Sequence, residues 1–496
     1  MSTGPGADSA PAPKNPATPG TPGSPGISGP PGTSGTSGTA GPPGSPGISV
    51  SDPAPDPASA SAAGRTRGGT FRSLRIRNYR LFATGAVISN TGTWMSRIAQ
   101  DWLVLSLTGS STAVGITTAL QFLPMLLFGL YGGVLADRCP RRLLLLFTQT
   151  ALGLCGLALA ALTLSGHVQV WHVYLIAFLL GMVTVVDNPT RQVFVNEMVG
   201  PKDLRNAVSL NSANFQSARL IGPAVAGVLI TAVGSGWAFL INGLSFGAPI
   251  IGLLLMRTSE LHKVERAPRG KGQLREGLRY VAGNPELIWP IVLVGFIGTF
   301  GFNFPIWLSA FADDVFHAGP GTYGLLNTLI AIGSVTGALL AARRVVARRR
   351  LLVGAALMFG VLEMVAAATP YFWLFAALMV PIGIFSLTFN VTANSSVQLA
   401  TDPAMRGRVM SLFMMVFVGG TPIGGPLVGW LTDTCGARIG FAAGGLVSAA
   451  AAAAVGLILV RAGGLRLKLD LRRGHPRVIF VPRTPETEEK PLAATA

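Results

Sequence analysis

The sequence predicts an all-α integral membrane protein with twelve transmembrane helices in two six-helix pseudo-repeats. Three observations indicate this fold class. Of 496 residues, 49% are hydrophobic and only 12% are charged, about half the charged share of a soluble domain. Long apolar stretches alternate with short polar breaks, and the second half of the chain repeats features of the first. This composition excludes a soluble enzyme.

Cofactor chemistry is also disfavoured. The three cysteines (Cys139, Cys155 and Cys435) and five histidines are scattered without the spacing of a metal cluster or a disulfide framework. No Walker-type phosphate loop is present, so nucleotide hydrolysis in this chain is not expected to drive any process. We therefore expect no cofactor, no metal site and no enzymatic activity.

Composition divides the chain into five segments. Residues 1–70 form a Pro/Gly-rich tail with a collagen-like Gly-X-Y run, and we expect this tail to be disordered, with a trimerising triple helix as the alternative. After the tail we predict an N-terminal six-helix half at 71–256, a cytoplasmic connector at 257–286, a C-terminal six-helix half at 287–460 and a basic cytoplasmic tail at 461–496.

Each predicted span is an apolar stretch long enough to cross a bilayer and bounded by polar residues, Gly or Pro. The twelve spans are predicted at 81–107, 113–136, 142–165, 171–190, 206–233, 236–256, 287–311, 322–342, 351–369, 371–392, 408–432 and 437–460. The breaks at Pro370 and at Gly234 to Gly236 separate neighbouring spans that a single long, tilted helix would otherwise merge.

The basic residues predict the orientation. If the N-terminus is cytoplasmic, 35 of the 38 Lys and Arg residues fall on the inner side, and only Arg438 lies in an outer loop. We therefore expect a multi-pass protein of the cell membrane with both termini cytoplasmic. The net charge of +17 reflects this topology and requires no nucleic-acid partner.

An internal repeat relates the two halves. Shifting the sequence by 202 positions aligns residues 181–244 with 383–446 without a gap and gives sixteen identities. Asn188 matches Asn390, and Gly222 matches Gly424. Transporters built from two such repeats bind their substrate between the halves and expose it alternately to each side.

The loop between the second and third predicted spans reads Gly133-Val-Leu-Ala-Asp137-Arg138-Cys-Pro140-Arg141-Arg142. It resembles the cytoplasmic loop of the major facilitator superfamily, with Pro140 where that family has Gly. Asp137 and Arg141 are spaced to pair one helical turn apart. The resemblance implies that Asp137 caps the eleventh span near Arg408 and closes the cytoplasmic side, with Asp187 extending the network. Ordinary positive-inside charge is the alternative.

The fifth predicted span carries Gly222, Pro223 and Gly227, similar to the G-P-x-x-x-G element of exporters in this superfamily. Gly and Pro bend a spanning helix and permit close packing. Segments from Asn90 to Leu123, from Asp187 to Gln192 and from Pro201 to Gly222 resemble the branch that contains the enterobactin exporter and related secretion transporters. This resemblance implies the major facilitator fold and outward transport.

Charged residues inside predicted spans are the candidates for a transport site, because a buried charge is costly unless it is paired or faces water. They are Arg97 and Asp101 in the first span, Arg219 in the fifth and Glu363 in the ninth. The resemblance places spans one, four, seven and ten around the cavity, which makes Asp101 the preferred proton carrier. Asn303 and Asn390 are candidate polar contacts. A structural ion pair between Arg97 and Asp101 is the alternative.

We therefore predict a monomeric secondary transporter that exports small organic molecules, such as siderophores, natural products or drugs, by proton antiport. Its partners are the substrate, protons and the lipid bilayer. One alternative is an importer or facilitator on the same fold. Another is a membrane scaffold or sensor that binds without transporting.

Overall fold

The computed structural model describes residues 71–262, 273–342, 349–462, 465–470 and 477–482. The predicted tail at 1–70 lies outside the described residues, as do parts of the connector and of the C-terminal tail.

The N-terminal helices alternate with short connections. They are η1 Arg72–Arg75, α2 Arg77–Thr108, α3 Ser111–Arg138, α4 Arg141–Leu164, α5 Val170–Val233, α6 Ser235–Ser245, α7 Gly247–Leu254 and η2 Thr258–Glu260. The later elements are α8 Gln273–Ala282, α9 Pro285–Phe300, α10 Phe304–Ala310, η3 Phe311–Val315, α11 Gly319–Ala342, α12 Arg349–Ala368, α13 Phe372–Ala400, α14 Arg406–Gly419, α15 Thr421–Cys435, α16 Ala437–Ala462, β1 Leu465–Asp470 and β2 Arg477–Pro482.

Every predicted span falls mainly on helix, with a break at 301–303 inside the seventh span. Ten helical stretches in the described part of the chain are long and apolar enough to cross a membrane. One of these stretches, α5, covers both the fourth and the fifth predicted spans. The first predicted span lies in α2, which is not among the ten. The all-α membrane fold is therefore confirmed, and the count of twelve stays a prediction.

The predicted loop between the fourth and fifth spans is much shorter in the structure. Helix α5 continues to Val199, Gly200 takes a positive φ of 67°, and the helix resumes at Pro201. Gly reaches this φ without a Cβ clash, and Pro is well placed at the start of a helix because its missing N–H would have no partner there. Two residues thus make the turn for which we predicted a loop of about fifteen.

The basic tail contains one element that we did not predict. Strands β1 and β2 pair antiparallel, with Leu465 opposite Pro482 and Asp470 opposite Arg477. This hairpin follows α16 and is the only sheet in the described residues.

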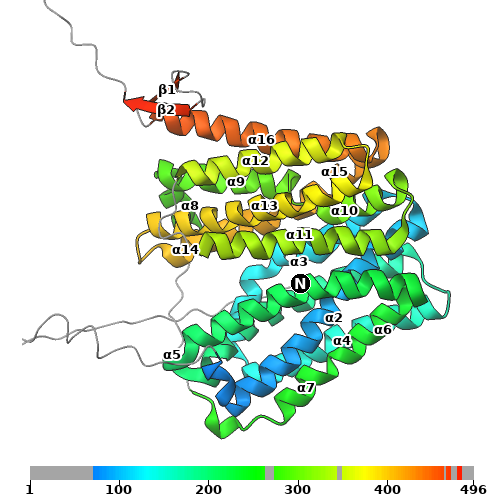
Figure 1. The fold of residues 1–496 in the computed structure, drawn as a ribbon. Coiled ribbons are helices and arrows are strands. Elements are labelled where there is room, and N and C mark those ends of the chain that lie inside the picture. Colours follow the sequence, from blue (N-terminus) through cyan, green and yellow to red (C-terminus); the bar gives the residue numbers. More distant parts are fainter. Residues whose placement is uncertain (1–70, 263–272, 343–348, 463–464, 471–476, 483–496) are drawn as a thin grey trace, which may run out of the picture. The chain divides into compact units, whose positions relative to one another are not determined.

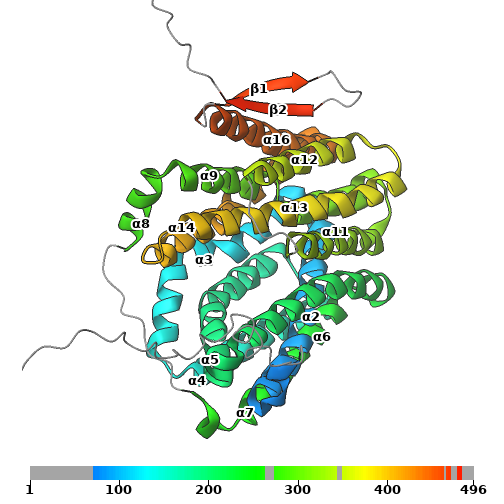
Figure 2. The same ribbon diagram turned by 60° about the vertical axis from the view of Figure 1, so that its left-hand side comes forward.

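The helices form two groups, which we call the N-terminal half (α2–α7) and the C-terminal half (α9–α16). Figures 1 and 2 show these groups on opposite sides, and the contacts between them run mainly through two pairs, α3 with α15 and α5 with α11. Within the C-terminal half a cluster of aromatic rings fills the core, with Phe311 stacked on Phe375 at 4.4 Å between centroids.

Glycines allow both helix pairs to approach closely. A Cβ added to Gly324 of α11 would lie 2.7 Å from the Cα of Gly227 in α5. A Cβ added to Gly429 of α15 would lie 2.6 Å from the carbonyl oxygen of Ser111 in α3. Gly227 and Gly429 are equivalent positions of the internal repeat, so the two halves meet through equivalent crossings.

Candidate substrate cavity and gates

A cavity of about 320 Å³ lies where the two halves meet. Its walls come from α2, α3 and α5 of the N-terminal half and from α9, α10, α11, α13, α14 and the start of α15 in the C-terminal half. This size is at the lower end of the range for small-molecule sites, which is roughly 300–1,000 Å³. Of the predicted site residues, Arg97, Asp101, Arg219, Asn303 and Asn390 line it.

Three charged residues face this cavity among those that the structure describes. Arg97 and Asp101 lie one turn apart on α2, and Arg219 comes from α5. The Arg97 guanidinium lies over the Trp94 ring at 5.1 Å from its centroid, and the Arg219 guanidinium lies over the same ring at 5.7 Å. One indole thus supports two cations through its π face.

Asp101 is almost fully buried, with 6% of its surface exposed. Its Oδ2 accepts a hydrogen bond of 2.8 Å from the Tyr323 hydroxyl of α11, and the Tyr323 ring stacks on Trp102. The bond crosses from one half to the other. Sequence reasoning missed Tyr323, because a tyrosine near the end of a predicted span is also typical of the aromatic belt at a membrane surface.

The two predicted asparagines line the cavity from the C-terminal half, one from a break between helices and one from within a helix. Asn303 lies between α9 and α10, and its side-chain amide donates to the Thr299 carbonyl at 2.7 Å. Asn390 lines the cavity from α13. Asn327 of α11 and Gln121 of α3 line it as well, and we did not predict them. Amides among aromatic walls suit an amphipathic ligand.

Glu363 is the exception among the predicted cavity residues. It is fully buried in α12, its Cβ packs against Gly445 of α16, and it is not among the residues that line the cavity. Its two carboxylate oxygens have no hydrogen-bond partner among the described residues. Helix α12 packs against α13 and α16 on the side away from the N-terminal half. The prediction that Glu363 lines the cavity is therefore wrong.

The predicted gating loop joins α3 to α4. Gly133, Asp137 and Arg138 lie near the end of α3, while Arg141 and Arg142 begin α4. Pro140 precedes α4 with φ −59°, so the family's glycine position needs no positive φ here.

The basic residues of this loop bind partners in the N-terminal half. Arg141 forms an ion pair with Glu197 of α5, and the Arg142 guanidinium donates to the carbonyl oxygens of Leu253 and Leu254 at the end of α7. Arg408 of α14, in the C-terminal half, forms an ion pair with Glu276 of α8, in the connector, at 2.8 Å.

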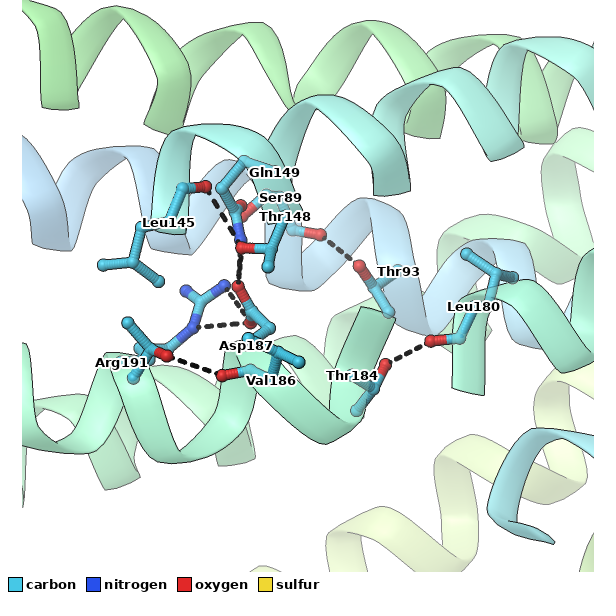
Figure 3. Close-up of polar contacts among 11 residues, drawn as sticks. Ser89, Thr93, Leu145, Thr148, Gln149, Leu180, Thr184, Val186, Asp187 and Arg191 are labelled. Carbon is cyan, nitrogen blue, oxygen red and sulfur yellow. Dashed lines mark hydrogen bonds and ion pairs between the residues drawn. The ribbon is translucent and has the colours of Figure 1, made fainter. Parts of the chain in front are cut away.

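Asp187 belongs to the interior of the N-terminal half. Figure 3 shows its carboxylate between α4 and α5, where it accepts hydrogen bonds of 2.7 Å from Thr148 and Gln149. Its other oxygen pairs with Arg191, one turn along α5, at 3.0 Å. With 4% of its surface exposed, Asp187 cross-links two helices of one half.

Asp433, a carboxylate that we did not predict, joins the halves at the end of α3 opposite the gating loop. Asp433 of α15 accepts hydrogen bonds from the Ser111 backbone N–H at 2.7 Å and the Ser110 hydroxyl at 2.7 Å. It also accepts from the Thr112 N–H at 3.0 Å and from its hydroxyl at 2.6 Å. These groups form the N-terminus of α3, which attracts a negative charge.

The exporter-type element lies on α5, beside the cavity and at the crossing with α11. Pro223 lines the cavity, and Gly222 packs against α2, where an added Cβ would lie 2.5 Å from the Cβ of Trp94. Gly227 forms the close crossing with Gly324.

Together, the bundle of apolar helices and the cavity between its halves define a multi-pass membrane transporter. A family model described as transmembrane secretion effector matches residues 68–470. The chain therefore belongs to this family of major facilitator superfamily transporters, which are not enzymes.

Curated relatives cover most of the chain. The staphyloferrin A transporter of Staphylococcus aureus is 24% identical over 72% of this chain and 89% of its own. The multidrug efflux pump Tap of Mycobacterium tuberculosis is 26% identical over 79% of this chain and 94% of its own. The enterobactin exporter EntS of Citrobacter koseri is 26% identical over 73% of this chain and 86% of its own.

A solved structure has the same fold. The crystal structure of a bacterial homologue of the human lysosomal transporter Spinster, inward-facing and unoccupied, matches with a TM-score of 0.60 at 16% identity. The match covers 77% of this chain and 95% of that one.

Proposed function

We propose that this protein exports small organic molecules across the cell membrane by proton antiport, with both termini in the cytoplasm and a monomer as the working unit. Siderophores, natural products and drugs are the proposed substrates. The relatives named for efflux or export support outward transport. The cavity between the two halves supports alternating access.

The observation that carries the proton coupling is the placement of Asp101. It is the one carboxylate among the described residues that line the cavity, and it is tied to the opposite half by Tyr323. In the proposed cycle, ionised Asp101 accepts the Tyr323 bond while the side near Asp433 is closed. When the halves rock, the bond opens and Asp101 takes a proton from outside, which it later releases to the cytoplasm.

Asp433 and Asp137 have complementary roles in this proposal. Asp433 closes the outer side in the described conformation through the N-terminus of α3. We propose that Asp137 closes the cytoplasmic side in the opposite conformation, near Arg408 of α14. The Arg408–Glu276 ion pair would then exist only while the cytoplasmic side is open.

Everted membrane vesicles test the function. The wild-type vesicles should accumulate at least one of fluorescein, Nile red and ethidium when their interior is made more acidic than the medium. They should lose the dye when a protonophore collapses this gradient. Asp101→Asn should prevent accumulation against the gradient but allow downhill exchange. Asp314→Asn is the matched control, because this exposed carboxylate lies outside the cavity.

Two results would overturn the proposal. Accumulation by Asp101→Asn would place the coupling elsewhere, with Glu363→Gln as the next variant to measure. Equilibration of every dye without regard to the proton gradient would identify a facilitator.

A further inference from the structure

We propose that the cavity selects small organic anions and that Arg97, Arg219 and Trp94 form the anion-binding site. The inference deepens the proposed function, because it takes the cavity as the substrate's binding site and adds the charge of the substrate. The sequence offered the two arginines as transport-site candidates without a specific role, and the inference gives them the role of binding the substrate.

The first step is the charge balance of the cavity. Two guanidiniums and one carboxylate line it, and the remaining lining residues among those described are neutral. The cavity therefore carries one uncompensated positive charge with Asp101 ionised and two with Asp101 protonated. A cationic ligand would increase this excess, whereas an anion would reduce it.

The second step is the absence of protein partners for the two cations. Within the described part of the chain, Arg97 and Arg219 form no ion pair and no hydrogen bond, and their guanidiniums lie over aromatic rings. Asp101 attracts Arg97 only from beyond ion-pair distance. Both side chains are only partly buried, so their donor atoms remain accessible from the cavity. Unpaired guanidinium donors in a membrane protein suit a carboxylate, catecholate, sulfonate or phosphate.

The third step is the geometry that holds both guanidiniums together. They share the Trp94 ring, with Arg97 also 5.9 Å from the Phe122 centroid. Packing of Gly222 against Trp94 brings α5 next to α2 and so places Arg219 beside Arg97. The phenylalanines opposite, among them Phe302 and Phe417, suit an aromatic or apolar body behind the anionic group.

The linkage to Asp101 has a definite sign. The charged or titratable groups that act on Asp101 are Arg97 on its own helix and the Tyr323 phenol on α11. Arg219 on α5 lines the same cavity beside Arg97. Protonating Asp101 removes the negative charge that opposes an incoming anion, so the anion binds more tightly when Asp101 is neutral. Proton and anion therefore favour each other's binding. Antiport then requires that the halves do not rock while both are bound.

The test uses three probes of one shape: naphthalene-2-sulfonate, naphthalene-2-sulfonamide and 2-naphthyltrimethylammonium. Calorimetric titration of the purified full-length protein should give a sulfonate affinity at least about tenfold above those of the neutral and cationic probes. Arg97→Gln and Arg219→Gln should each weaken sulfonate binding about tenfold or more, with Arg→Lys at each position restoring part of it. Arg257→Gln, an exposed arginine outside the cavity, is the matched control and should bind normally.

Asp101→Asn separates the two charge models most sharply. For an anionic substrate this variant should bind the sulfonate at least as tightly as the wild-type protein at neutral pH. For a cationic substrate held by Asp101 it would lose binding. Thermal unfolding of each variant confirms that it is folded before its affinity is interpreted.

Three outcomes would overturn the inference. They are equal or tighter binding of the ammonium probe, sulfonate binding that both arginine variants retain, and no binding of any probe. Each of these is read from affinities alone, whereas the proposed antiport is read from dependence on the proton gradient. Loss of gradient dependence with intact sulfonate selectivity would thus reject antiport and leave the anion site standing.

Discussion

The Tyr323 hydroxyl donates a 2.8 Å hydrogen bond to Oδ2 of Asp101 and so joins α11 to α2 across the boundary between the halves. The acceptor is a nearly buried carboxylate, and the donor ring is held by its stack on Trp102. A change in the charge of Asp101 therefore acts directly on the C-terminal half through this hydrogen bond.

Tyr323→Phe should favour the conformation in which the outer side is open. The ring and its stack on Trp102 remain, while a hydrogen bond to a charged group, worth about 1.5–3 kcal/mol, is lost. Spin labels at His167→Cys and Tyr371→Cys in a cysteine-free protein should report a larger fraction of long distances. Tyr79→Phe is the control, because the Tyr79 hydroxyl bonds Ala207 within the N-terminal half. Equal distance distributions for the two variants would contradict this role.

Asp433→Asn should weaken the closure of the outer side. The amide retains one acceptor oxygen in place of two, and loss of a helix cap costs about 0.5–2 kcal/mol. The same label pair should again show longer distances, with a smaller effect at high salt because Asp433 is exposed. Asp203→Asn, whose carboxylate pairs with Arg72 inside one half, should leave the distances unchanged. Wild-type distances in Asp433→Asn would show that this cap does not hold the outer side closed.

Asp187→Asn should lower stability more than it lowers transport per folded molecule. The substitution leaves Arg191 without its carboxylate partner in a buried network, and breaking such a pair costs about 3–5 kcal/mol. The midpoint of thermal unfolding in detergent should fall, while initial transport rates normalised to folded protein should stay near wild type. Normal stability combined with lost transport would instead assign Asp187 to the cytoplasmic gate, as the sequence suggested.

The native cysteines test the predicted orientation. Cys435 is exposed at the end of α15 next to Asp433, and Cys139 lies in the loop between α3 and α4. A membrane-impermeant maleimide should label Cys435 in intact cells and Cys139 in everted vesicles. Cys435→Ser and Cys139→Ser identify the labelled positions. Labelling of Cys139 from outside intact cells would show that the orientation is the opposite of the predicted one.

Much of the architecture could be predicted because the bilayer imposes simple rules on sequence. Long apolar stretches, the positions of basic residues and the repeat at 202 positions predict an all-α bundle in two related groups. Local patterns were less reliable at element ends. The turn at Gly200 needs one residue with positive φ, and neither hydropathy nor charge marks so short a break.

The candidate site was predicted in part. Arg97, Asp101 and Arg219 stand out in the sequence because a charge inside an apolar span is rare. The same signal brought in Glu363, which the structure places away from the cavity. A charge inside an apolar stretch indicates burial, but it does not indicate whether the side chain points to the cavity or to another helix.

The sequence by itself determined that this protein crosses the membrane many times, that its halves are related and that a few charges lie within the spans, because each of these properties is a local pattern along one chain. Only the tertiary structure decided which residues meet. Tyr323 and Asp101 are separated by 222 positions, and Asp433 and Ser111 by 322. No local pattern encodes such a pairing, since it arises from the packing of helices whose glycines let their backbones approach.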